Sequence, residues 1–580
     1  MSTTTMRILV MQTTRMGDVL QTTPLVRALR CKYPDAHIAY MVRNMGKAIA
    51  QRNPDVNEVL VHEEDEMYLD MRSDDSDRFL RAYRTAEAQI ARLRDGRYDI
   101  AFNCTHSIAS SMLLKLAGIP KVVGAHLSDD WQYVLRGRWI NYFYTSVFHR
   151  EYNDLNLCDI SQRFLEDVDP QRRLVFETNE EDEAFADDLL RRHGIAPSDF
   201  IVCLQLGASE DSKRWAEIRF AELARLLAGK YKAKILLVGV REEAHLGQVF
   251  EQHAPGIATH LYGETTIPQL AAILKRARLL ITNDTGTMHI AAAMDCKVLL
   301  VSVGFVHFRE TGPYGEGHCA IEWRRAHIGR ADNVPVGMDE RALIQPEQVM
   351  RAVEYLLEND GDGPIRQMDE SPEMVPVDLY TTRFASDGCL AWYPVLRRPI
   401  TDRDLLRIAY RAMWLQHLSG LAQTSPSDLP SPATRHLLYY NPPDPDLVNV
   451  RGPELASRFE KLATLARRGI EWTEELLVCL KQTRGVKHAR QIAAELARLD
   501  EEIRVFSEVH PCCKPLALIA RYERDNLEGS DPLNLAETTL GIYKDCETRA
   551  LLMREKLLAL LKAIGHCQSG PENSNEANTP

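Results

Sequence analysis

The segment Leu279-Leu-Ile-Thr-Asn-Asp-Thr-Gly-Thr-Met-His289 decides the fold class of this 580-residue chain. Its first four residues are apolar or β-branched and predict a buried strand that ends at Thr282. A short turn then opens into a predicted helix over 287–294, and the apolar run 297–303 predicts the next strand. A strand, a tight turn, a helix and a further strand are typical of a parallel sheet with helices on both faces.

The same alternation occurs twice before residue 360. We predict two doubly wound α/β domains of similar size, residues 1–175 and residues 176–360. Ligands of such domains bind in the loops that follow the carboxyl ends of the strands. The loops of interest are therefore 13–18, 206–215, 239–243 and 283–289.

The pattern changes after residue 360. Residues 361–378 are rich in Asp, Glu, Gly and Pro and are predicted to form a linker. Residues 379–566 carry helical periodicity and are predicted to form a mainly helical appendage, a candidate surface for a protein partner of unknown identity. The polar tail 567–580 is predicted to be disordered.

The bulk composition is that of an ordinary globular protein, with 45% hydrophobic and 26% charged residues. A net charge of −12 argues against a nucleic-acid binder. The start of the chain lacks the features of a secretory signal, and no apolar run is long enough to span a bilayer. We expect a cytoplasmic protein, with peripheral contact to the inner face of the inner membrane left open.

The turn 283–289 is the strongest candidate for a ligand site. The N-terminus of a helix presents unpaired N–H groups that favour a phosphate, and Gly286 lets the backbone approach a ligand closely. Two plainer interpretations stay open: Asp284 as a simple helix cap and His289 as a buried core residue.

Three other loops after strands carry suitable side chains. Ser209 and Lys213 offer a hydroxyl and a cation to an anionic ligand such as a diphosphate. Asp18 could act as a general base on an acceptor hydroxyl, and Glu243 could accept hydrogen bonds from a ribose. The alternatives are solvated loops and helix starts.

Several common signals are absent from the sequence. It has no GxxxxGK[ST] phosphate loop, no HExxH and no GxSxG motif. Asp75-Ser-Asp77 lies inside the acidic stretch 62–77, which we interpret as a solvated insertion rather than a metal site. We predict no metal and no further cofactor.

Taken together, these segments resemble the ADP-heptose:lipopolysaccharide heptosyltransferases of glycosyltransferase family 9. The resemblance rests on several motifs that occur in the same order between residues 7 and 349. They include Met16-Gly-Asp-Val-Leu20, Tyr98-Asp-Ile100, Gly207-Ala-Ser209, Lys213-Arg-Trp215, Asn283-Asp-Thr-Gly286, Met288-His289 and Thr311-Gly-Pro-Tyr-Gly315. Residues 360–580 lie outside it.

The resemblance implies a GT-B fold, in which two Rossmann-like domains face each other and bind the acceptor and the nucleotide-sugar donor. It implies an inverting, metal-independent transfer of heptose from ADP-heptose to lipopolysaccharide or a related surface glycan. Asp18 would be the general base, and Lys213 would stabilise the leaving diphosphate. The implied donor-binding residues are Ser209, Lys213, Glu243, Asp284, Thr285, Gly286 and His289.

Two departures from the family pattern leave alternatives open. Ala208 stands where some members have a second hydroxyl, and the acidic stretch 62–77 should repel a phosphorylated acceptor. An acceptor other than the lipopolysaccharide inner core is therefore left open, and a different nucleotide sugar is the first alternative to ADP-heptose. The others are a non-catalytic scaffold with a degenerate transferase core, and a nucleotide-sugar epimerase on the same two-domain fold.

Overall fold

The computed structural model describes residues 5–167, 169–324, 339–359, 364–369, 371–420, 431–482 and 486–568. The chain divides into two compact units. Unit 1 consists of residues 1–127, 135–140 and 155–396, and unit 2 consists of residues 128–134, 141–154 and 397–580. The predicted disordered tail lies outside the described residues from residue 569 onward.

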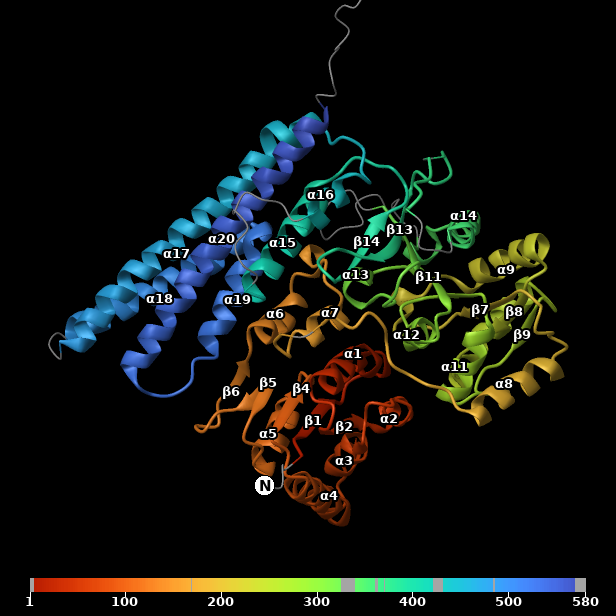
Figure 1. Cartoon of the computed structure of the whole chain (residues 1–580), viewed down its shortest axis with the longest axis horizontal. Helices are drawn as coiled ribbons and strands as arrows, with labels where there is room; N and C mark the ends of the chain where they lie inside the picture. Colours follow the sequence, from red (N-terminus) through yellow and green to blue (C-terminus); the bar gives the residue numbers. More distant parts are fainter. Residues whose placement is uncertain are drawn as a thin grey trace, which may run out of the picture. The chain divides into compact units, whose positions relative to one another are not determined.

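The first sheet has six strands in the order β3-β2-β1-β4-β5-β6 (Figure 1). The strands from β3 to β5 pair in parallel with their neighbours. In the central strand β1, Leu9 lies beside Ala39 of β2 and Ala101 of β4. The strands are β1 (Arg7–Gln12), β2 (His37–Arg43), β3 (Glu58–His62), β4 (Ile100–Asn103), β5 (Val122–Leu127) and β6 (Tyr133–Arg136).

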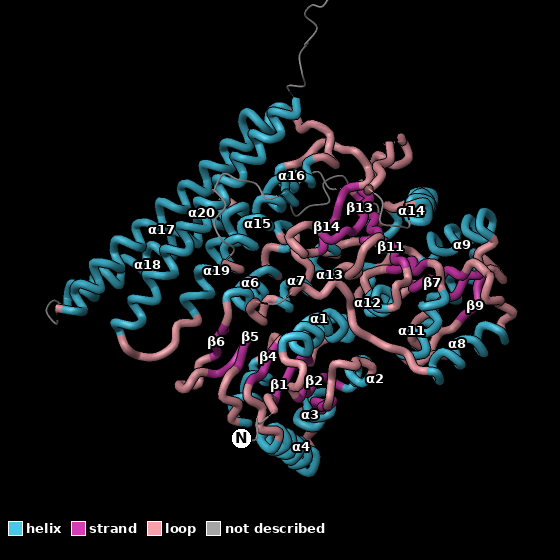
Figure 2. The backbone as a smooth tube through the Cα atoms, in the orientation of Figure 1, coloured by secondary structure: helices cyan, strands magenta, loops and turns pink. Residues whose placement is uncertain are grey.

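Helices cover both faces of this sheet, because successive strand side chains point in opposite directions (Figure 2). Leu9 packs with Leu93 of α4 and Leu114 of α5, whereas the Tyr40 hydroxyl donates to the Val19 carbonyl of α1. The helices are α1 (Met16–Lys32), α2 (Lys47–Gln51), α3 (Glu64–Met71), α4 (Ser76–Asp95), α5 (Ile108–Ala117), α6 (Arg138–Ser146) and α7 (Leu157–Gln162). The predicted α/β class is confirmed here.

The second sheet has eight strands in the order β14-β13-β12-β11-β10-β7-β8-β9. It is parallel from β9 to β12, and the two last strands add to it in antiparallel fashion. The strands are β7 (Ile201–Gln205), β8 (Lys234–Leu237), β9 (Ala258–His260), β10 (Leu279–Thr282), β11 (Lys297–Ser302), β12 (Cys319–Trp323), β13 (Val377–Phe384) and β14 (Leu390–Pro394).

The predicted domain borders need correction at this sheet. We expected the second α/β domain to end at 360, a linker over 361–378 and a helical appendage from 379. Instead β13 pairs with β12 from Val377 to Thr381, and β14 is the edge strand. The pairing with β12 is a tertiary contact, which the local composition of the segment does not reveal.

The helices of the second domain are amphipathic and cover the sheet. One face packs into a continuous core that contains Leu204, Trp215, Phe220 and Val353. The helices are α8 (Glu180–Arg192), α9 (Glu217–Tyr231), α10 (Ala244–His253), α11 (Ile267–Arg276), α12 (Gly286–Ala293), α13 (Phe308–Thr311) and α14 (Pro346–Glu358). Short 3-10 turns, η3 (Asp211–Lys213) and η4 (Arg241–Glu243), follow β7 and β8.

Unit 2 is mainly helical. Long helices α17, α18 and α20 run alongside one another (Figure 1), and the guanidinium of buried Arg549 binds both Glu523 oxygens. Its helices are α15 (Asp402–Leu418), α16 (Ser431–Leu437), α17 (Gly452–Lys481), α18 (Val486–Val509), α19 (Lys514–Asp525) and α20 (Pro532–Gln568). Within the described residues, no helix is both long and apolar enough to cross a bilayer.

Candidate active site at the carboxyl edges of the two sheets

Asp18 lies in the first turn of α1, directly after β1. Its Oδ2 accepts from the Arg15 N–H at 3.1 Å and lies 2.7 Å from the Thr14 hydroxyl. Asp18 is the third residue of α1, and its carboxylate pairs with the N–H of the N-cap residue Arg15 as in a capping box. The carboxylate therefore stabilises the start of the helix, although Asp18 is not the N-cap residue. Among the described residues its Oδ1 has no hydrogen-bond partner, and the side chain is half-buried. One oxygen therefore remains available for chemistry.

The first turns of α1 and α12 approach closely because glycines occupy both. A Cβ atom on Gly17 would lie 2.9 Å from His289 Cδ2 and 3.2 Å from His289 Nε2. A Cβ atom on Gly286 would lie 2.2 Å from the end of Met16. The predicted base in the first domain and the predicted donor turn in the second domain are thus brought together.

His289 is buried, with 4% of its surface exposed. Burial lowers the pKa of its imidazole to about 4, and the opposing effect of the Asp18 charge is smaller. Its Nδ1 has no hydrogen-bond partner in the described part of the chain. The imidazole is therefore neutral near pH 7, and a buried ring nitrogen is left unpaired beside the candidate base.

The turn before α12 is fixed by Asn283, which is fully buried. Its amide donates to the carbonyls of Leu206 and Gly207, at 2.9 and 3.1 Å, and its oxygen accepts from the Trp215 N–H at 2.9 Å. Asn283 therefore ties the loop after β7 to the loop after β10.

The helix α12 begins with Thr285 as its N-cap residue and Gly286 as its first helical residue. Asp284 precedes the cap and is half-buried, so the interpretation of Asp284 as the cap is wrong. The first N–H groups of a helix have no partners within the helix, so this helix start can bind an anion.

The two predicted ligand-binding residues of the loop after β7, Ser209 and Lys213, differ in exposure to solvent. Ser209 is exposed, whereas the Lys213 side chain is 19% exposed and its Nζ lies 3.8 Å from Glu210 Oε1. Arg214 is committed to structural ion pairs with Asp211 and Glu217, both at 2.8 Å. Lys213 is therefore the cation of this loop that suits an anionic ligand.

The Glu243 carboxylate lies between the loops after β7 and β8. Its Oε2 accepts from the Gln205 amide at 2.9 Å and from the Val240 N–H at 3.2 Å. Cβ atoms on Gly207 and Gly239 would collide with it, at 1.8 and 2.4 Å. Both glycines are thus needed for Glu243 to sit beside the predicted diphosphate loop.

The acidic stretch 62–77 is largely exposed to solvent, and His62 and Asp70 are its buried residues. It is also helical: it forms α3 and the start of α4, and Asp75 caps α4 by accepting from the Asp77 N–H. Asp70 is 8% exposed and binds Arg78 and Arg81, which hold the pKa of its carboxyl far below the usual range. Arginines of α4 therefore offset part of the acidic charge.

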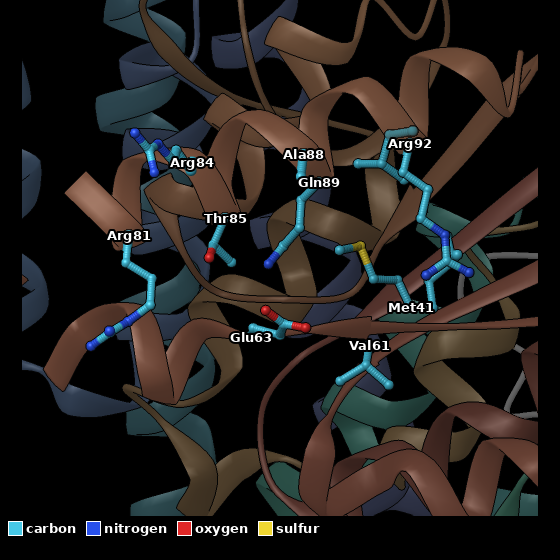
Figure 3. Close-up of a pocket in the computed structure, with 11 residues that line it drawn as sticks. Met41, Val61, Glu63, Arg81, Arg84, Thr85, Ala88, Gln89 and Arg92 are labelled. Atoms are coloured by element: carbon cyan, nitrogen blue, oxygen red, sulfur yellow. The ribbon is translucent and has the colours of Figure 1, made fainter. Parts of the chain in front are cut away.

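A cavity of about 350 Å³ lies between α4 and the strands β2 and β3 (Figure 3). The Glu63 carboxylate and the Gln89 amide point into it from opposite walls in Figure 3, and Met41 forms part of its apolar floor. Arg84 lines it and makes no ion pair within the described residues. The cavity adjoins the end of β3, at the carboxyl edge of the first sheet.

No group of three or more His, Cys, Asp or Glu side chains is arranged to hold a metal ion within the described ranges.

Comparison with known proteins identifies the family. Residues 87–321 match the sequence family described as glycosyltransferase family 9 (heptosyltransferase). Over these residues the chain is similar to glycosyltransferase family 9. It is a glycosyltransferase, and the matched region includes the donor loops but begins after Asp18.

Individual relatives agree with this assignment. The chain is 24% identical over 304 residues to lipopolysaccharide heptosyltransferase 2 of Escherichia coli K12, covering 50% of this chain and 80% of that protein. It is 23% identical over 288 residues to lipopolysaccharide heptosyltransferase 3 of Escherichia coli, covering 49% and 79%. A solved family 9 glycosyltransferase from Veillonella parvula superposes with a TM-score of 0.51 at 22% identity, covering 62% of this chain and 99% of that one. The two-domain GT-B fold is confirmed.

Two site residues received no role from the sequence, although Asn283 lies in the predicted donor turn. Asn283 holds the donor loops together, and Gln205 positions Glu243 while accepting from the Thr287 hydroxyl at 3.2 Å. Both are buried polar residues at the ends of parallel strands, at 0% and 3% exposure. An amide among apolar strand residues is the signal that could have identified them, since buried polar groups are almost always hydrogen-bonded.

Proposed function

We propose that this family 9 glycosyltransferase moves a heptose from ADP-heptose to lipopolysaccharide or a related surface glycan, with inversion and without a bound metal. The observation that carries the proposal is the contact between the first turns of α1 and α12. It places Asp18 beside His289 at the meeting point of the two carboxyl edges. A base from one domain then reaches a donor bound by the other.

In the proposed reaction, Asp18 Oδ1 accepts the proton of an acceptor hydroxyl while that oxygen attacks the anomeric carbon of the donor. The bond between this carbon and the diphosphate oxygen breaks, and its electron pair leaves with the nucleoside diphosphate. Attack from the face opposite the leaving group inverts the anomeric centre. Oδ2 stays bound at the helix start, which fixes the direction of the carboxylate.

The leaving diphosphate gathers negative charge, and the second domain offers two means of stabilising it. Lys213 supplies a cation, and the start of α12 supplies N–H groups with Thr285 and Gly286. Ser209 joins the same loop, and Asp284 and His289 lie where the donor sugar would follow. Glu243 is proposed to hold the ribose hydroxyls, since its carboxylate adjoins Gly207 at the start of that loop.

The first domain is proposed to bind the acceptor. Arg84 offers an unpaired cation at the cavity of Figure 3, so a phosphorylated or acidic glycan need not be repelled by the acidic stretch. The names of the relatives in Escherichia coli support lipopolysaccharide as the acceptor class. We further propose a cytoplasmic site of action, with peripheral contact to the inner membrane.

Substitution of Asp18 by Asn tests the mechanism. Asn keeps the shape and the hydrogen bond at the helix start but cannot accept the proton. Transfer from ADP-heptose should fall by about 10²–10⁴-fold, the usual contribution of a general base, with ADP affinity within a few-fold of wild type.

The matched control is Asp95→Asn, an exposed carboxylate at the end of α4, which should transfer at the wild-type rate. Full activity of Asp18→Asn would remove Asp18 from the mechanism.

A further inference from the structure

A second cavity lies at the opposite end of the second sheet from the donor loops. It has a volume of about 280 Å³ and is bounded by the starts of β11 and β12, the end of β13 and the segment before α8. We name it the amino-edge cavity. Ala292, near the end of α12, also lines it, so six helical residues, about 9 Å at 1.5 Å per residue, separate it from the donor turn at Gly286.

Cationic side chains converge on the amino-edge cavity. Arg172, Arg173 and Lys297 line it. The Arg172 guanidinium carbon lies over the Phe384 ring, 5.4 Å from its centroid, and the side chain makes no ion pair in the described part of the chain. A guanidinium over an aromatic ring can still direct N–H groups at an anion.

His318 adds a neutral donor to this wall. Its Nδ1 accepts from the Val298 N–H at 3.2 Å, so the proton of the neutral ring is on Nε2. Burial lowers the pKa of His318 to about 3, and the ring therefore stays neutral at physiological pH.

Two glycines leave space beside the donors of the amino-edge cavity, where Lys297 Nζ also donates to the Glu316 carbonyl at 3.4 Å. A Cβ atom on Gly315 would lie 2.8 Å from His318 Nε2, and one on Gly317 would lie 2.7 Å from Lys297 Nζ. Gly317 also has a positive φ of 72°, which other residues rarely adopt. Any side chain at these positions would fill the space in front of the two nitrogens.

Acceptors line the cavity beside these donors. Asp295 pairs with Arg173 at 2.8 Å, but both side chains are more than 70% exposed, at 79% and 73%. Such an exposed pair contributes little to stability, so a ligand anion can replace the carboxylate at Arg173. Asp295 and Glu316 can then accept from hydroxyl groups.

We propose that the amino-edge cavity binds a small sugar phosphate, with the phosphate at Arg172, Lys297 and His318 Nε2 and the hydroxyls at Asp295 and Glu316. The volume lies just below the usual range of about 300–1,000 Å³ for ligand pockets, so the cavity suits only a small molecule. The site is separate from the donor loops and does not depend on the proposed transfer reaction.

Calorimetric titration of the full-length protein with glucose 6-phosphate, inorganic phosphate and glucose tests this proposal. Glucose 6-phosphate should bind, glucose should not, and inorganic phosphate should bind at least several-fold more weakly. Arg172→Gln and Lys297→Gln should each weaken glucose 6-phosphate binding about tenfold or more, because each removes a charge-assisted contact.

The controls separate this cavity from the donor site. Arg225→Gln removes an exposed arginine of α9 and should leave glucose 6-phosphate affinity unchanged, and ADP affinity should be equal in all variants. Saturating ADP should not displace the sugar phosphate. Absence of glucose 6-phosphate binding, binding that survives both substitutions, displacement by ADP, or equal affinity for inorganic phosphate would each overturn the proposal.

Discussion

At the scale of single residues, the approach of α1 to α12 depends on the absence of a side chain at Gly17. Gly17→Ala places a methyl group 2.9 Å from the stiff, buried ring of His289. We expect a loss of about 1–3 kcal/mol in the free energy of unfolding, as for other overpacked contacts, and a lower transfer rate. Denaturant unfolding and initial rates measure the two effects.

Gly229→Ala is the control for this substitution. Gly229 lies within α9, and a Cβ atom there meets nothing within 4 Å. Alanine should stabilise the helix by about 0.5–1 kcal/mol. If Gly17→Ala behaves like Gly229→Ala, the first turns of α1 and α12 are not in tight contact.

His289 gives a pH-dependent prediction at the same scale. Its folded pKa of about 4 lies below the unfolded value, so the unfolded chain binds its proton first as the pH falls. Its contribution to stability is complete above about pH 6.5 and is lost as the pH falls toward 4. Between pH 7 and pH 5, His289→Gln should lose about 2 kcal/mol less stability than wild type. Parallel loss in both proteins would show that His289 titrates normally in the fold.

At the scale of elements, the donor site is a set of loops after neighbouring parallel strands that are joined by buried amides. Asn283→Ala removes three hydrogen bonds between the loop after β10 and the loop after β7. We expect ADP affinity to fall at least about tenfold, because the loop that carries Lys213 is no longer held. Hydrogen exchange in residues 206–215 should rise markedly. Unchanged exchange in this loop would contradict the role of Asn283.

Element boundaries were predictable where the burial pattern of a strand is simple. The strand at 279–282 was predicted to the residue, because a short apolar run of this length is fully buried in a parallel sheet. The helix α3 was not predicted, because it has no apolar face in the sequence. Its buried residue is Asp70, which is paired with two arginines of the next helix, α4. Only the folded contact shows that this acidic stretch is ordered.

At the scale of the whole molecule, the sequence predicted the α/β class and a mainly helical C-terminal part, but not the full extent of the second sheet. The strand β13 follows a segment rich in Asp, Glu and Pro, which conceals its pairing with β12. The close approach of Gly17 in α1 to His289 in α12 also arises only in the assembled unit 1.

Truncation at the predicted domain border tests the corrected architecture. A chain that ends at residue 360 lacks β13 and β14 and leaves the apolar strand β12 as an open edge. Exposed apolar edges promote aggregation, so we expect little soluble protein on size-exclusion chromatography. A monomeric product that binds ADP like the full-length chain would show that the hairpin is dispensable.

The most direct test of the central claim is calorimetric titration of the full-length protein with ADP, UDP, GDP and CDP, in wild type and Lys213→Ala. A nucleotide-sugar site at the second sheet predicts selective binding of ADP and a clear loss of ADP affinity in Lys213→Ala, with the fold intact by circular dichroism. Selective binding of another diphosphate would change the donor but keep the site. Failure of all four to bind the wild-type protein would contradict the donor site itself.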